Sequence, residues 1–96
     1  MFNSNKEAAK IEKATDGLAR MHKSAIVNAI VIEVYELNES RYKLVRYELE
    51  ANRDIKADSV YTAVVHKDKY NKSIEADCYD RLRNFHQLDA LFHGAF

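Results

Sequence analysis

The sequence has no proline, no tryptophan, only two glycines and a single cysteine. So few glycines exclude the glycine-rich phosphate loops that mark the common nucleotide-binding proteins. The lone Cys78 has no partner for an intrachain disulfide, which is typical of a reducing compartment. The first residues are polar from position 3, unlike a signal peptide, and no apolar run is long enough for a membrane span. We therefore expect a cytoplasmic protein.

An excess of either charge is also missing. Lys and Arg together number 15, as do Asp and Glu, so the formal net charge is zero. A dedicated nucleic-acid binder is usually basic, so the balance makes that class less favoured without excluding a local patch. Weak repulsion between copies favours self-association. With 96 residues, 47% of them hydrophobic, the chain is expected to fold as a single compact domain over residues 1–96.

Three segments have the composition of β-strands. Residues 25–37 form the longest apolar run, rich in β-branched side chains, and both alternating faces are apolar between Ile26 and Ile32. We interpret this run as one central strand. Residues 41–50 and 60–66 are the next two strands. The short polar break at 38–40 predicts a hairpin, and residues 51–59 predict a loop.

Helices are predicted on either side of these strands. The first runs from Ser4, where Glu7 completes a capping box, to about Lys23. Alternatively, Asp16 and Gly17 end a first helix and begin a second short one. The last helix is predicted from about residue 74 to 93 with Ser73 as its N-cap. Its apolar stripe comprises Ile74, Cys78, Leu82, Phe85, Leu88 and Phe92.

The expected fold class is therefore α+β. It is a three-stranded antiparallel meander with an N-terminal and a C-terminal helix, in the order α-β-β-β-α, packed on one sheet face. The other face would then carry tyrosines and charged side chains, and residues 67–72 would form a charged connector.

Residues with catalytic or metal-binding chemistry do not form a convincing set. His86 and His93 are two helical turns apart, roughly 10 Å along the axis, so they cannot share one metal ion without another ligand. We expect Asp89 to pair with His86, and His93 to interact with the helix C-terminus. Cys78 falls in the apolar stripe, where cysteine is usually an inert small hydrophobe. We therefore predict no catalytic residue, no metal, no cofactor and no enzymatic activity.

The strands and the C-terminal segment hold the best candidates for a contact surface. Tyrosines with mixed charges on an uncovered sheet face are typical of protein-binding surfaces. The aromatic chain end either docks into the core or contacts another subunit. We predict a small non-catalytic protein that acts by protein–protein interaction, an inhibitor or adaptor such as phages and mobile elements encode. A homodimer through the final helix is a further expectation. The predicted partner-binding residues are Tyr35, Glu36, Tyr42, Tyr47, Phe92 and Phe96.

The alternative prediction is nucleic-acid binding through the connector and the start of the last helix. The order helix, three strands, helix is similar to that of the double-stranded RNA-binding domain, in element order only. Lysines precede the last helix in that family, as they do here, although residues 67–72 contain no glycine and include Asp68. The candidate residues are Lys67, Lys69, Lys72, Arg81 and Arg83.

Overall fold

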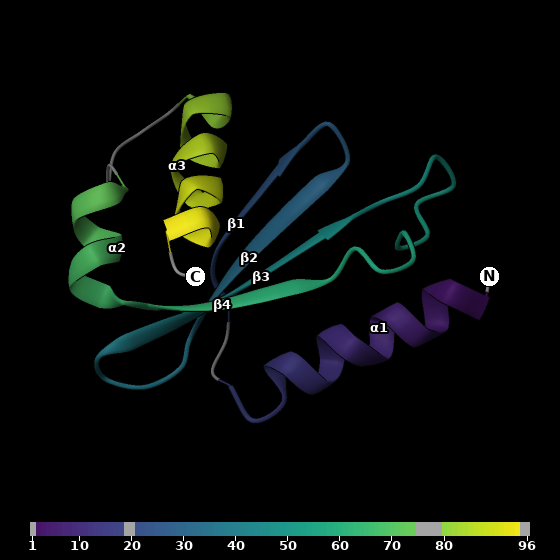
Figure 1. Cartoon of the computed structure of the whole chain (residues 1–96), viewed down its shortest axis with the longest axis horizontal. Coiled ribbons are helices and arrows are strands. Elements are labelled where there is room, and N and C mark those ends of the chain that lie inside the picture. The colour runs from purple at the N-terminus through teal and green to yellow at the C-terminus, as the bar shows by residue number, and fades with distance from the viewer. Residues whose placement is uncertain (1, 19–20, 75–79, 95–96) are drawn as a thin grey trace.

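A computed structural model describes residues 2–18, 21–74 and 80–94 of the chain. Four strands form one antiparallel sheet, in which spatial order follows chain order: β1 (Met21–Val27), β2 (Ile30–Glu36), β3 (Arg41–Glu48) and β4 (Tyr61–His66). Helix α1 (Phe2–Thr15) precedes the sheet, and α2 (Lys67–Ser73) and α3 (Arg81–Gly94) follow it (Figure 1). The predicted α+β class, an antiparallel meander between helices, is confirmed, with four strands in place of three.

The extra strand arises because residues 25–37 are two strands rather than one. Asn28 and Ala29 both adopt positive φ, 51° and 67°, and Val27 pairs with Ile30 across them. Two consecutive positive φ values in a two-residue loop are the signature of a type I′ turn, whose twist matches that of the flanking strands. The apolar run therefore folds back on itself as the β1–β2 hairpin.

The first helix ends at Thr15, eight residues before the predicted end near Lys23. Gly17 has φ +74°, the left-handed conformation that closes many helices, and the Leu18 N–H donates to the Thr15 carbonyl at 3.1 Å. The alternative prediction of an end at Asp16 and Gly17 is thus correct, but the second short helix that it placed there is wrong, because the next element is strand β1. The start differs too, because the helix begins at Phe2, ahead of the predicted cap Ser4.

The predicted last helix is wrong in its first part. The connector that we expected at residues 67–72 is helix α2, and Ser73, the predicted N-cap, is its last residue. Helix α3 begins at Arg81, where Asp80 Oδ1 accepts hydrogen bonds from the N–H groups of Leu82 (3.0 Å) and Arg83 (3.2 Å). Cys78 lies outside the described residues. No helix in the described part is long and apolar enough to cross a membrane.

The main core lies between the sheet and the two C-terminal helices. Ile32 and Leu44 of the sheet and Leu88 of α3 are completely buried. In Figure 1, α2 and α3 lie on one side of β4 and α1 lies on the other, so the terminal helices do not share one sheet face as we expected. The buried members of this core are Ile32, Val34, Tyr42, Leu44, Ala63, Val65, Tyr70, Ile74, Phe85, Leu88, Leu91 and Phe92.

Candidate functional site

The sheet face that points away from α2 and α3 carries the candidate contact surface. Residues directly opposite each other in antiparallel strands share a face. Tyr35 opposes Lys43, and Val31 opposes Tyr47 and Ile26, while Glu33 opposes Val45. We call this surface the tyrosine face. Its members with side chains that are not fully buried include Met21, Ile26, Glu33, Tyr35, Lys43, Tyr47 and Val64.

Glu33 holds both tyrosines in place. The Tyr35 hydroxyl donates to Glu33 Oε1 at 3.0 Å, and the Tyr47 hydroxyl donates to Glu33 Oε2 at 3.1 Å. Burial, together with the hydrogen bond to Glu33 and its negative charge, raises the pKa of each tyrosine to about 12. One carboxylate thus fixes two aromatic rings on adjacent strands and keeps both phenols neutral well above neutral pH.

Exposed aliphatic side chains flank the two tyrosines. Ile26 on β1 is 51% exposed and Val64 on β4 is 45% exposed. Both belong to the tyrosine face, because Ile26 opposes Val31 and Val64 opposes Lys43. Since β1 and β4 are the two edges of the sheet, their outer backbone groups are not paired with another strand. Apolar groups at such a place are typical of contact surfaces.

The six predicted partner-binding residues do not form one surface. Of the five that belong to the described residues, only Tyr35 and Tyr47 lie on the tyrosine face. Tyr42 points to the opposite face and is buried, so its predicted place on an open surface is wrong. Glu36 is exposed on that opposite face and forms an ion pair with Lys67 at 3.5 Å, whereas Phe92 is buried in the core. Phe96 lies outside the described residues.

Sequence reasoning missed five members of the tyrosine face, which are Met21, Ile26, Glu33, Lys43 and Val64. Glu33 had a usable signal, since it precedes Tyr35 by two residues and must share its face if the segment is a strand. Ile26 and Val64 had none. Residues 60–66 were already the last strand of the predicted meander, so only the edge position of Ile26 depends on the division of residues 25–37 into two strands.

Tyr42 is instead part of an aromatic cluster beside a cavity. The His22 ring stacks on it with a centroid distance of 4.9 Å, and the Tyr70 ring meets it edge-on at 4.7 Å. Lys67 Nζ lies 5.1 Å from the centre of the Tyr42 ring on its face. The cavity has a volume of about 750 Å³. Its lining residues are His22, Lys23, Tyr42, Tyr70, Asn71, Lys72 and Ile74.

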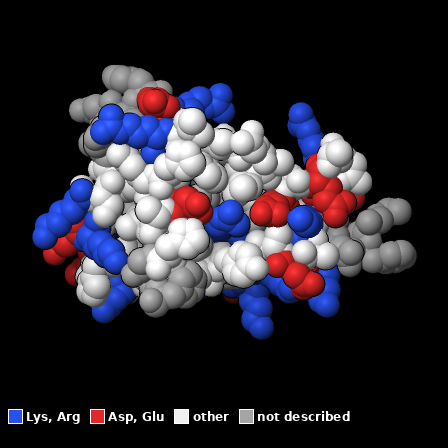
Figure 2. All heavy atoms as spheres, turned by 45° about the horizontal axis from the view of Figure 1, so that its top comes forward, with Lys and Arg blue, Asp and Glu red and all other residues white. Residues whose placement is uncertain are grey.

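The five basic residues of the alternative prediction fall in separate places. Lys67 is engaged by Glu36 and Tyr42, and Lys72 lines the aromatic cavity. Lys69 and Arg83 line a groove of about 500 Å³ between α2 and α3. Arg81 borders a different hollow, beside β1. On the face that Figure 2 shows, basic and acidic side chains are interspersed, as the zero net charge leads one to expect.

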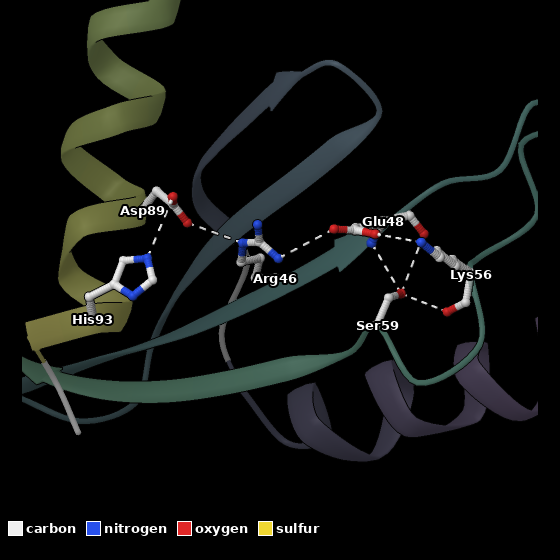
Figure 3. A network of polar contacts seen from close by, with 6 residues as sticks. All are labelled: Arg46, Glu48, Lys56, Ser59, Asp89 and His93. Carbon is white, nitrogen blue, oxygen red and sulfur yellow. Dashed lines mark hydrogen bonds and ion pairs between the residues drawn. The ribbon is translucent and has the colours of Figure 1, made fainter.

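A chain of polar contacts ties α3 to the sheet and to the long loop after β3 (Figure 3). Arg46 Nε donates to Asp89 Oδ1 at 3.1 Å, and Asp89 Oδ2 lies 3.9 Å from His93 Nε2. Glu48 continues the chain, 3.9 Å from Arg46 and 3.5 Å from Lys56. Asp89 therefore pairs with Arg46 and His93, where we expected His86.

The polar contacts around Glu48 and Lys56 also fix the backbone of the loop after β3. Ser59 Oγ accepts a hydrogen bond from the Glu48 N–H at 3.1 Å and donates to the Lys56 carbonyl at 2.6 Å. Ser59 is buried, so these bonds satisfy a hydroxyl that water does not reach. The contacts have a structural role, because they close the loop against the end of β3.

Metal-binding side chains do not gather at one place among the described residues. Within the ranges 2–18, 21–74 and 80–94, no three His, Cys, Asp or Glu side chains are placed to hold a metal ion. Cys78, the one thiol, is outside these ranges. Comparisons of the chain with protein-family models, with curated proteins and with solved structures found no match.

Proposed function

We propose that the chain is a small non-catalytic protein that acts by protein–protein interaction, as an inhibitor or adaptor, and that its partner contacts the tyrosine face. The observation that carries this proposal is the pairing of Tyr35 and Tyr47 through one carboxylate, Glu33, between the exposed side chains of Ile26 and Val64.

The arrangement suits a binding surface for a physical reason. Tyrosine supplies a large contact area with few rotatable bonds, and it is enriched in interface hot spots. Side chains that are already fixed before contact lose little conformational entropy on binding. Glu33 provides that fixing here. The aliphatic side chains on either side would exclude water from the tyrosines, and Lys43, which opposes Tyr35, adds a charge that favours a partner with a matching acid.

Capture with matched surface variants tests the proposal. The wild-type protein and the variants Val64→Glu and Ile26→Glu are each immobilised and exposed to lysate from the source cell, and the bound proteins are identified. The control is Leu82→Glu on α3, because Leu82 is 51% exposed and lies outside the tyrosine face. Circular dichroism of all four proteins shows whether the fold is retained.

We expect a bound protein that the wild type and Leu82→Glu retain and that both tyrosine-face variants lose. A charge buried without a partner in an interface weakens association strongly, so the loss should be roughly tenfold or more in affinity. The proposal fails if all four proteins capture the same set, or if Leu82→Glu alone loses its partner.

A homodimer is an alternative form of the same proposal. A homodimer was expected through the last helix, but Phe85, Leu88 and Phe92 of that helix are buried within the chain itself. A second copy would therefore use the tyrosine face. Light scattering tests this, because a dimer would have twice the 11.1 kDa mass of one chain. If the tyrosine face forms the dimer, the Val64→Glu variant would have the mass of a monomer.

The nucleic-acid alternative has one observation in its favour. Lys69, Arg83 and His86 line the same groove between α2 and α3, so two cations and a histidine converge there. Binding to phosphates would weaken steeply with added salt, because counterions are released on contact. We expect Arg83→Gln to weaken such binding if the groove is used. Absence of binding to either RNA or DNA at low salt would end this alternative.

A further inference from the structure

We propose that the cavity beside α2 binds a small organic anion that has an aromatic or apolar body. It lies on the sheet face opposite the tyrosine face, so it is a second site, separate from the proposed protein contact. Three observations carry the proposal: the way the cavity is built, the buried hydroxyl group of Tyr70, and the charges of the lining residues.

The aromatic wall depends on an irregularity in β1. The pairing register between β1 and β2 shifts between Met21 and Lys23, which makes His22 the extra residue of a bulge. Met21 opposes Tyr35 on the tyrosine face, while the His22 ring stacks on Tyr42 on the other face. The bulge therefore adds a ring to the cavity wall that a regular strand would place elsewhere. Bulges are frequent next to binding and active sites.

Tyr70 supplies a polar group that lacks its hydrogen bond. The residue is only 4% exposed, and within the described part of the chain its buried hydroxyl has no hydrogen-bond partner. An unsatisfied hydroxyl destabilises the fold, and nearly all buried polar groups avoid that state. Burial next to Tyr42 raises the pKa of Tyr70 to about 12, so the group stays a donor at neutral pH. A ligand oxygen would accept this hydrogen bond.

The charge of the lining favours an anion. Lys23 and Lys72 contribute two ammonium groups, and Asn71 contributes an amide. Among the described residues that line the cavity there is no Asp or Glu, although the chain contains 15 of them. The other lining residues, His22, Tyr42, Tyr70 and Ile74, are aromatic or apolar, which suits a ring or an aliphatic body better than an inorganic ion. A volume of about 750 Å³ is within the usual range for small-molecule sites.

The test is an amide NMR titration with phenyl phosphate, a probe that joins an aromatic ring to an anion. Inorganic phosphate and phenol are the two controls, because each represents one half of the probe. We expect saturable shifts at His22, Lys23, Asn71 and Lys72 with phenyl phosphate, and affinities at least about tenfold weaker for each control, because each makes only half of the contacts.

Two variants locate the binding groups. Lys72→Gln should weaken the binding of phenyl phosphate roughly five- to tenfold, because a charge-assisted contact is lost. Lys69→Gln is the matched control, since it makes the same change in the same helix but faces the groove between α2 and α3. Tyr70→Phe keeps the ring and removes the hydroxyl. It should therefore lower the affinity for phenyl phosphate by about tenfold without lowering the melting temperature of the free protein.

Three results would overturn the proposal. They are shifts that do not saturate, equal losses for Lys72→Gln and Lys69→Gln, and unchanged affinity in Tyr70→Phe. The variant Val64→Glu separates this site from the proposed protein contact. It should leave phenyl phosphate binding intact even where it abolishes capture of a protein partner, so either proposal can fail while the other stands.

Discussion

At the scale of single residues, the most informative group is the carboxylate of Glu33. It accepts one hydrogen bond from Tyr35 and one from Tyr47, so each of its oxygens is used by a different strand. A neutral phenol can donate these bonds and a phenolate cannot. The geometry of the tyrosine face therefore depends on the protonation of two tyrosines.

Alkaline titration tests this dependence. Folding raises the pKa of Tyr35 and of Tyr47 from the usual value of 10 to about 12, so folding favours their protonated forms. Their contribution to the free energy of unfolding is then complete below about pH 10, declines between about pH 10 and 12, and is lost above that range. We expect near-ultraviolet absorbance to show that Tyr35 and Tyr47 ionise later than a free tyrosine.

The variant Glu33→Gln identifies the cause. Removing the negative charge should bring both pKa values partly back toward 10, since burial remains and the charge does not. Glu36→Gln is the control, because Glu36 is on the same strand and faces the other side. An identical titration for Glu33→Gln and the wild type would contradict the role given to Glu33.

At the scale of elements, the β1–β2 hairpin shows where the sequence stops being informative. A two-residue type I′ turn is usually recognised in a sequence by the pair Asn-Gly, whereas this chain has Asn28 and Ala29 in the turn. With an alanine there and apolar residues on either side, the pattern is that of one continuous buried strand. Strands β3 and β4, the antiparallel order and the loop at 51–59 were predictable, because alternation and polar breaks mark them.

Ala29 is expected to be a strained position, which gives a stability prediction. Its φ of 67° is in the left-handed region, where the Cβ atom costs about 1 kcal/mol and glycine is free of that cost. We expect Ala29→Gly to raise the free energy of unfolding by about 0.5–1 kcal/mol in urea denaturation.

The same substitution elsewhere provides the control. Ala90 is exposed in helix α3, and Ala90→Gly should lower stability by about 1 kcal/mol because glycine disfavours a helix interior. Opposite signs for the two variants support the type I′ turn. Destabilisation by Ala29→Gly of the size seen for Ala90→Gly would contradict it.

The prediction of the C-terminal helices was wrong for a different reason. Ser73 precedes acidic residues and an apolar stripe, which is the usual signal for a helix start, yet Asp80 provides the N-cap of α3. Both residue types cap helices well, and only tertiary packing chooses between them. The stripe was correct from Phe85 onward, since its periodicity is strong there, whereas Leu82 is exposed.

At the scale of the whole molecule, α3 is held on the sheet by the apolar core and by one polar connection. Arg46 and Asp89 are both partly buried, at 20% and 25% side-chain exposure, and they join β3 to α3 at 3.1 Å.

A double-mutant cycle with Arg46→Ala and Asp89→Ala should give a coupling free energy of about 1–2 kcal/mol, more than an exposed pair would. The matched cycle is Lys56→Ala with Glu48→Ala, a more exposed pair at 3.5 Å, for which we expect below about 1 kcal/mol. Equal couplings would contradict a special role for Arg46 in docking α3.

The whole molecule therefore has two distinct sides. One is covered by α2 and α3 and holds the main core, and the other carries the tyrosine face and is the side of β4 on which Figure 1 shows α1. The sequence predicted that tyrosines would lie on an open face; Tyr35 and Tyr47 lie on the face opposite α2 and α3, and both are partly buried. It misplaced Tyr42, because the chain alone does not show that α2 exists and packs over that ring.

The most direct measurement of the central claim is site-specific photo-cross-linking in the source cell. A photoreactive phenylalanine analogue replaces Val64 or Ile26 on the tyrosine face, or Leu82 on α3 as an equally exposed control. We predict a discrete protein adduct from positions 64 and 26 and none from position 82. An adduct from position 82 alone, or equal adducts from all three, would contradict the assignment of the tyrosine face as the partner-binding surface.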